Sequence, residues 1–193
     1  MTAREDGSKD LNIKNNELAG KTVKELNILL ENAIKSQDIK TVKELVHNGV
    51  DVNNTSASSR GYTPLRYAVF MKNIEIVRLL IKSGANVNKI SADGHTPLKI
   101  ACSAYESPPV DDMVKLLLDN GAEPGIYNKG TDGPLHYAAM YKQPGAVKLL
   151  VQYGADVNAK GSYGRTPLIY GASSARMPDM VKFLIDSGAD VNA

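Results

Sequence analysis

The sequence is poor in cysteine and histidine, and this scarcity limits the chemistry that the chain can support. Its 193 residues include one cysteine, Cys102, so no internal disulfide can form. The three histidines are widely separated and lack the short spacing typical of zinc ligands. A single thiol suits a reducing compartment, and we therefore expect a cytoplasmic protein.

Long apolar runs and a strong excess of charge are also missing. No segment approaches the roughly 20 apolar residues that a membrane-spanning helix requires, and the polar residues 1–20 lack the apolar core of a signal peptide. The net charge of +2 at pH 7 gives no electrostatic reason to expect nucleic acid or an anionic membrane as partner. Several lysines alternate with apolar residues and are expected to keep outer helices soluble: Lys82, Lys115, Lys148 and Lys182.

Catalytic and cofactor motifs are absent from the sequence as well. The glycine-containing segment Gly121-Ala-Glu-Pro-Gly125 lacks the following lysine of a phosphate-binding loop. Asp111 and Asp112 are adjacent, so they need not converge on one substrate atom, and we expect them in solvent. Cys102 occupies a helix position that suits a small buried residue, which favours an inert packed thiol. We therefore predict no enzymatic activity, no cofactor and no metal.

What the sequence does contain is an internal repeat. Four segments align, with prolines separated by 33, 37 and 33 residues: Gly61-Tyr-Thr-Pro-Leu65, Gly94-His-Thr-Pro-Leu98, Thr131-Asp-Gly-Pro-Leu135 and Gly164-Arg-Thr-Pro-Leu168. About 20 residues after each proline comes a second motif: Ser83-Gly-Ala-Asn-Val-Asn88, Asn120-Gly-Ala-Glu-Pro124, Tyr153-Gly-Ala-Asp-Val-Asn158 and Ser187-Gly-Ala-Asp-Val-Asn192. Asn48-Gly-Val-Asp-Val-Asn53 is an earlier copy without an upstream Thr-Pro-Leu. Two motifs that keep the same period indicate a repeat architecture.

Each motif predicts a helix boundary. Thr63 before Pro64 is a suitable N-cap followed by proline at the first helical position, and the same pair recurs at Thr96 and Thr166. Gly84 can adopt the left-handed conformation that ends a helix. Between these boundaries, apolar spacing predicts a short helix and then a longer one, whose apolar residues are Ile76, Val77, Leu79, Leu80 and Ile81. One such helix pair cannot bury its apolar face alone, so neighbouring pairs must stack.

These motifs resemble the ankyrin repeat. Pro134-Leu-His-Tyr-Ala138 is close to the family signature, and Gly154-Ala-Asp-Val-Asn158 matches its usual ending. The resemblance implies an all-α solenoid of about five stacked helix-turn-helix repeats joined by β-turn or hairpin-like loops, in which His136 makes a structural hydrogen bond. The chain departs from the pattern where Arg66, Lys99 and Ile169 replace the histidine, Gly133 replaces the threonine and Gly171 replaces an inward-facing alanine. We expect these changes to weaken single repeats without breaking the register.

The expected organisation is a disordered polar segment, 1–21, followed by one repeat domain, 22–193, with repeats at about 22–57, 58–90, 91–127, 128–160 and 161–193. The first repeat carries a polar covering that suits a solvent-facing cap, formed by Lys24, Glu25, Asn27, Glu31 and Lys35. The last repeat lacks one, so we expect that the array continues or that something else covers this apolar face. The chain is expected to be a monomer unless that face pairs. Residues 104–112 insert a proline-containing turn, either a partner contact or a tolerated surface insertion.

The resemblance further implies that the loop tips and the exposed sides of the first helices line a concave binding surface. Its candidate residues are Arg60, Tyr62, Phe70, Met71, Asp93, His95, Ser103, Ala104, Asp132, Met140, Tyr141, Tyr163, Arg165, Ser173 and Ser174. Phe70 falls outside the Leu65 and Ala68 core stripe and is typical of an interface anchor, particularly beside methionine and tyrosine. The tyrosines that repeat at one fixed place are better interpreted as packing residues: Tyr67, Tyr137 and Tyr170.

We therefore predict a non-enzymatic protein-interaction module, a scaffold or adaptor whose partner is another protein. The alternative is a targeting or substrate-recruiting segment of a larger enzyme or secreted effector. Abundant Lys, Asn and Ile resemble ankyrin proteins of intracellular bacteria, which would place such an effector in the host-cell cytoplasm. The resemblance also implies possible hydroxylation sites at the turn asparagines Asn53, Asn158 and Asn192.

Overall fold

The computed structural model describes residues 18, 20–55, 61–103, 110–128, 130–173 and 177–193. Within these ranges the chain forms α-helices and one short 3-10 helix, and it contains no strand. The helices are α1 (Val23–Lys35), α2 (Ile39–His47), α3 (Pro64–Phe70), α4 (Ile74–Lys82), α5 (Pro97–Cys102), α6 (Asp111–Asp119), α7 (Pro134–Met140), α8 (Pro144–Gln152), η1 (Ser162–Gly164), α9 (Pro167–Ala172) and α10 (Pro178–Asp186). The predicted all-α class is confirmed.

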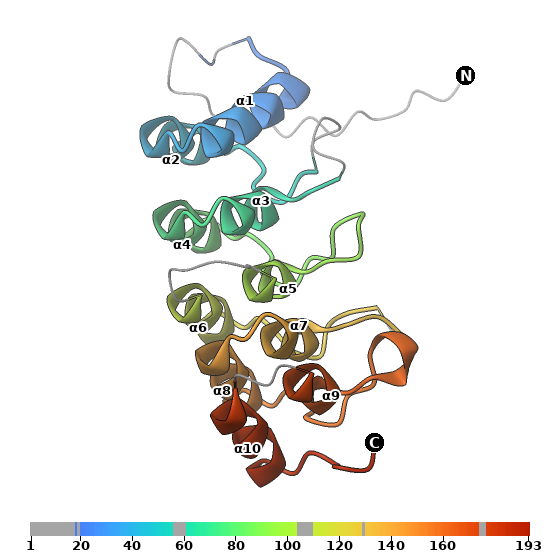
Figure 1. Cartoon of the computed structure of the whole chain (residues 1–193). Helices are drawn as coiled ribbons and strands as arrows, with labels where there is room; N and C mark the ends of the chain where they lie inside the picture. Colours follow the sequence, from blue (N-terminus) through green and yellow to red (C-terminus); the bar gives the residue numbers. More distant parts are fainter. Residues whose placement is uncertain (1–17, 19, 56–60, 104–109, 129, 174–176) are drawn as a thin grey trace, which may run out of the picture.

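The helices stack as pairs in two parallel rows (Figure 1). The first helices of the pairs are α1, α3, α5, α7 and α9, and each contacts the next along its row. The second helices form the other row, with contacts between α2 and α4, α6 and α8, and α8 and α10. Connecting loops project beyond the first helices, away from the second row. Each internal pair is thus covered on both sides by its neighbours, as a solenoid requires.

One continuous core runs between the two rows. In the second pair, Leu65 and Ala68 of α3 pack with Ile76 and Leu80 of α4, and all four side chains are buried. Gly171 of the last pair is also buried, and a Cβ there would lie only 3.3 Å from the terminal methyl group of Met180. An alanine there would therefore make a tight contact with the methionine side chain. None of the described helices has the length and apolar content needed to cross a membrane.

The helix boundaries predicted at the Thr-Pro pairs are confirmed, although only two of the three threonines cap through the side chain. The hydroxyl oxygens of Thr63 and Thr96 accept hydrogen bonds from backbone N–H groups three residues later, at 3.1 and 3.2 Å. Thr166 also stands at an N-cap, but its buried hydroxyl has no hydrogen-bond partner among the described residues. The predicted N-cap position of Thr166 is therefore confirmed, but its side chain makes no capping hydrogen bond. Gly84 follows the C-cap of α4 with φ +87°, so this helix ends as expected.

Two details at the ends of elements differ from the sequence-based expectations. Glu31, expected in the solvent-facing covering, is only 6% exposed because it pairs with Lys35 inside the contact between α1 and α3. Asp111 and Asp112 belong to the first turn of α6, so the insertion predicted for residues 104–112 ends at Val110. Residues 104–109 and 1–17 lie outside the described residues, and the repeat boundaries stay predictions.

Turn asparagines join neighbouring repeats. The Asn158 amide donates to the carbonyl oxygen of Gly188 at 2.9 Å, and its amide oxygen accepts from the N–H of Asp190 at 2.8 Å. The same pair of bonds is made from equivalent positions in the first two repeats, by Asn53 and Asn88. Gly125 occupies this position in the third repeat, so its turn lacks the bridging side chain.

Candidate functional site

The surface formed by the first helices and the loops that precede them is called the inner wall below. Its most exposed large apolar side chain on a helix is that of Phe70, at the end of α3, which is 60% exposed. The Phe70 ring meets Tyr67 edge-on, with 6.3 Å between ring centroids. Tyr67 is half-buried and packs against the core, as expected for a packing residue. Met71, the C-cap of α3, follows directly after Phe70.

A second apolar cluster lies two repeats away, at the end of α7. Met140 is the last residue of this helix and Tyr141 is its C-cap, and both are half-buried. The rings of Tyr137 and Tyr141 are 5.7 Å apart and tilted. On α5, between the two clusters, Ser103 stands in the place of Phe70 and Met140, and Ile100 is buried in the place of Tyr67 and Tyr137. The inner wall thus presents two bulky apolar clusters separated by a small side chain.

Beneath these clusters runs a row of buried ionisable residues. Each directly follows the leucine that recurs in the first helix of every repeat. In the first four repeats these residues are Glu31, Arg66, Lys99 and His136. His136 Nδ1 accepts a hydrogen bond from the Gly133 N–H at 3.1 Å, and Nε2 lies 2.9 Å from the carbonyl oxygen of Ala159. This confirms the expected structural role of His136. The burial of the other three residues was not predicted. The only feature of the sequence that could have indicated it is that they occupy the repeat position equivalent to His136.

The charges of this row are compensated across repeats. Arg66 forms an ion pair with Asp93 of the next repeat, and its guanidinium stacks on the Tyr62 ring at 3.4 Å from the centroid. The Lys99 ammonium lies 5.1 Å from the centroid of the Tyr137 ring. Burial lowers the pKa of Lys99, although the carboxylates of Asp132 and Asp93 oppose this shift. The ion pair of Arg66 thus connects the second and third repeats, and the Lys99 contact connects the third and fourth.

Two of the predicted contact residues, Asp93 and Asp132, already have partners inside the chain. Asp132 accepts hydrogen bonds from the Tyr170 hydroxyl and from the Ser162 N–H, each at 3.0 Å. His95 Nδ1 lies 3.7 Å from Asp93 and makes no hydrogen bond among the described residues. Burial and the nearby Lys99 lower the pKa of His95.

The remaining predicted residues are spread along the wall. Tyr163 is 95% exposed at the tip of the loop before α9, where its φ of 59° is left-handed. Arg165 is exposed beside it, with its guanidinium 5.8 Å from the centroids of both the Tyr163 and the Tyr170 rings. The structure thus places Tyr163 apart from the clusters at α3 and α7. Arg60, Ala104 and Ser174 lie outside the described residues.

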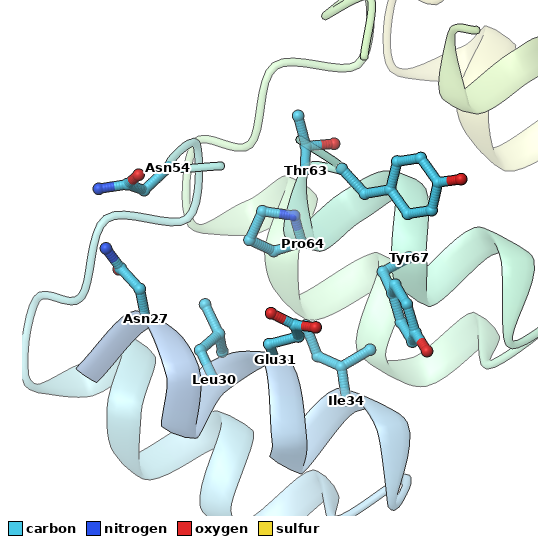
Figure 2. Close-up of a pocket in the computed structure, with 9 residues that line it drawn as sticks. Asn27, Leu30, Glu31, Ile34, Asn54, Thr63, Pro64 and Tyr67 are labelled. Atoms are coloured by element: carbon cyan, nitrogen blue, oxygen red, sulfur yellow. The ribbon is translucent and has the colours of Figure 1, made fainter. Parts of the chain in front are cut away.

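A shallow pocket opens between the first and second repeats (Figure 2). Figure 2 shows Leu30, Glu31 and Ile34 of α1 rising toward Pro64 and Tyr67 of α3. Asn27, at its edge, has a buried amide oxygen without a hydrogen-bond donor among the described residues. Because the Glu31 carboxylate already binds Lys35, this pocket brings together no nucleophile with a general base. Its geometry supports packing between repeats.

Among the described residues, the cysteine is inaccessible and no metal-binding cluster is present. Cys102 is fully buried, and burial raises the pKa of its thiol, so it is an inert packing residue as predicted. The described ranges hold no group of three or more side chains of the types that bind metal ions. The inner wall presents the exposed rings of Phe70 and Tyr163 and the half-buried side chains of Met71 and Met140.

Comparison with known proteins identifies a family model for most of the chain and relatives of about two thirds of it. A family model described as ankyrin repeats (3 copies) matches residues 29–128 and 104–193. The chain is 37% identical over 133 residues to the ankyrin repeat, SAM and basic leucine zipper domain-containing protein 1 of Dasypus novemcinctus, covering 68% of this chain and 27% of that protein. The protein of the same name from Rhinolophus ferrumequinum is 38% identical over 116 residues, covering 60% and 24%. The chain thus spans about a quarter of the length of these relatives.

Proposed function

Since the chain belongs to the ankyrin-repeat family, whose members are generally protein-interaction modules, we propose that it is a non-enzymatic scaffold or adaptor. The partner is a protein, and it binds the inner wall. In this proposal the chain acts as a monomer in the cytoplasm, without a cofactor.

The observation that carries this proposal is the exposure of Phe70 beside Tyr67 on a helix whose other face is locked in the core. Exposing such a ring to water costs about 2 kcal/mol relative to burying it, so a partner that covers it gains that energy. The helix is already ordered by its neighbours, and binding therefore requires little further loss of conformational entropy. Met140 and Tyr141 supply a second anchor of similar composition.

The proposal is tested by partner affinity of single variants. A partner is first purified from the native cell on the full chain, and its dissociation constant is then measured for Phe70→Ala and Tyr141→Ala. We expect each variant to lose at least about tenfold in affinity. Ile185→Ala is the matched control, because Ile185 is 43% exposed but lies on the second helix α10.

Thermal unfolding of each variant must match that of the unmodified chain, so that lost affinity reports contact and not unfolding. Affinities that stay within a few-fold for both inner-wall variants would show that the partner uses another surface. An equal loss of partner affinity for Ile185→Ala would likewise show that the inner wall is not the specific binding surface.

A second function is favoured by the length of the relatives. Their printed names include SAM and basic leucine zipper domains, and the matched region is about a quarter of each protein. The chain could likewise recruit a target for a larger enzyme or a secreted effector, which would act in the host-cell cytoplasm. Sequencing the complete open reading frame tests this alternative, since a catalytic domain in the same frame would establish it.

A further inference from the structure

A strained turn forms the tip of the loop before α9. The backbone N–H of Arg165 donates to the carbonyl oxygen of Ser162 at 3.2 Å and closes a four-residue turn. Its two central residues, Tyr163 and Gly164, have φ of 59° and 70°, the left-handed values that a type I′ turn requires at both positions. Asparagine, aspartate and glycine are favoured at the first central position, whereas a bulky side chain there is strained. The tyrosine therefore opposes the stability of this turn.

The same position of the fourth repeat is occupied by glycine. Gly130 lies four residues before Pro134, as Tyr163 lies four residues before Pro167. The backbone of Gly130 is also left-handed, with φ of 75°. Since the fourth repeat forms its loop without a side chain at this position, the loop itself does not require the tyrosine.

The Tyr163 ring also contributes little to packing within the chain. It is 95% exposed, and its cationic neighbour Arg165, 5.8 Å from the ring centroid, is exposed as well. Tyr137 and Tyr170, in contrast, are half-buried and pack against the core. A strained residue that gains no burial inside the molecule is typical of a functional contact.

We propose that Tyr163 is a further anchor for the protein partner, and that its phenol ring enters an apolar pocket on a folded domain of that partner. This inference rests on the proposed interaction function and specifies the shape of the partner. The short helix η1, which carries Tyr163, projects beyond α9 on the side away from the second row (orange in Figure 1). A projecting ring is fully buried only by a concave surface, and tyrosine is common among the side chains that fill such pockets.

The turn prepares the ring for binding. Its backbone is closed by the bond from Arg165 to Ser162, and a second bond joins the Gly164 N–H to the carbonyl oxygen of Gly161 at 3.1 Å. The direction of the Tyr163 side chain is therefore set before the partner arrives, which reduces the conformational entropy lost on binding.

A folded protein fits this tip better than an extended peptide or a nucleic acid does. A peptide lying across the tip would cover one face of the ring and leave the other in water. Single strands of nucleic acid are bound by several aromatic rings along a basic groove. In the described part of this loop, one exposed ring is accompanied by one exposed cation, Arg165.

Substitutions of Tyr163 separate the strain from the contact. Tyr163→Asn places a favoured residue in the turn and removes the ring, so the melting temperature should rise by about 2–4 °C. Its affinity for the protein purified on the full chain from the native cell should fall at least about tenfold. Tyr163→Phe keeps both the ring and the strain, and it should bind within a few-fold at an unchanged melting temperature. A variant that is more stable but binds less tightly cannot owe its lost affinity to unfolding.

Gln37→Asn is the matched control, because Gln37 is exposed and left-handed, with φ of 56°, in the turn between α1 and α2. This variant should also raise the melting temperature while its affinity stays within a few-fold. The need for a folded partner is tested by digesting the purified partner with trypsin. The digest should lose the binding that depends on Tyr163, because the pocket exists only in the folded domain.

Unchanged affinity of Tyr163→Asn, or a melting temperature that does not rise, would overturn the inference. So would Tyr163-dependent binding of the tryptic peptides, or of a single-stranded 20-nucleotide DNA, and so would an equal loss of affinity for Gln37→Asn. The two proposals fail in distinguishable ways. If Phe70→Ala loses affinity and Tyr163→Asn does not, the inner wall stands without this anchor, whereas full affinity of both variants would remove both proposals.

Discussion

At the scale of single residues, a threonine hydroxyl stabilises a helix start only when it reaches a backbone N–H. Thr63 and Thr166 occupy equivalent positions before a proline, and both are buried. The Thr63 hydroxyl accepts from the Arg66 N–H, whereas that of Thr166 has no partner among the described residues. The threonine hydroxyl therefore stabilises the start of the helix in one repeat, whereas in the other it is buried without a hydrogen bond and lowers stability.

Replacing each threonine by valine separates these two cases. Thr63→Val should lower the free energy of unfolding by about 1 kcal/mol, because the helix loses its cap. Thr166→Val should be neutral or slightly stabilising, since it removes a buried hydroxyl that has no hydrogen bond. Urea unfolding of both variants measures the difference, and equal losses would contradict the assigned roles.

The buried ring of His136 makes stability depend on pH. Burial lowers its pKa despite the hydrogen bond to Ala159 and the nearby Asp132 carboxylate. A histidine whose folded-state pKa lies below the unfolded value of about 6.5 binds protons more readily when unfolded. Stability is therefore full above that value and decreases as pH falls through it.

We expect the free energy of unfolding to decrease between about pH 7.5 and 5.5, and His136→Gln to flatten this decrease. The variant should be less stable at every pH, because it loses the hydrogen bonds to Gly133 and Ala159. A smaller slope should remain, since the pKa of His95 is lowered as well. Urea titrations at five pH values provide the measurement, and an unchanged slope in the variant would exclude His136 as its source.

At the scale of the repeat elements, turn asparagines couple each helix pair to the next. Asn88 and Asn158 each make two hydrogen bonds to the following repeat, but Gly125 interrupts the series between the third and fourth repeats. The turn itself is retained there, because the Ile126 N–H still donates to the Glu123 carbonyl oxygen at 3.2 Å. The interface between the third and fourth repeats thus lacks the asparagine side-chain hydrogen bonds but keeps its helix packing.

Gly125→Asn should restore this connection and raise the free energy of unfolding by about 1 kcal/mol. The site has room, since a Cβ at Gly125 would meet no atom within 4 Å beyond its chain neighbours. Gly125→Ala is the control, because it restricts the unfolded chain without supplying an amide. Thermal unfolding compares the two variants, and an asparagine variant no more stable than the alanine variant would argue against the bridge.

At the scale of the whole molecule, the features that the sequence predicts are those set by local backbone preferences or by the repeat period. Pro64 and Gly84 mark helix boundaries by their own backbone preferences, and the exposure of Phe70 follows from helical spacing. The ion pair between Arg66 and Asp93 could not be predicted, because it depends on which loop residue of the next repeat lies opposite.

The measurement that tests the inner wall most directly is hydrogen–deuterium exchange of the full chain, alone and with the protein partner purified on it. We predict slower exchange in α3, α5 and α7 and in the loops that precede them, because these elements form the bound surface. Exchange in α4, α6 and α8 should stay unchanged. Protection confined to these second helices would contradict binding on the inner wall.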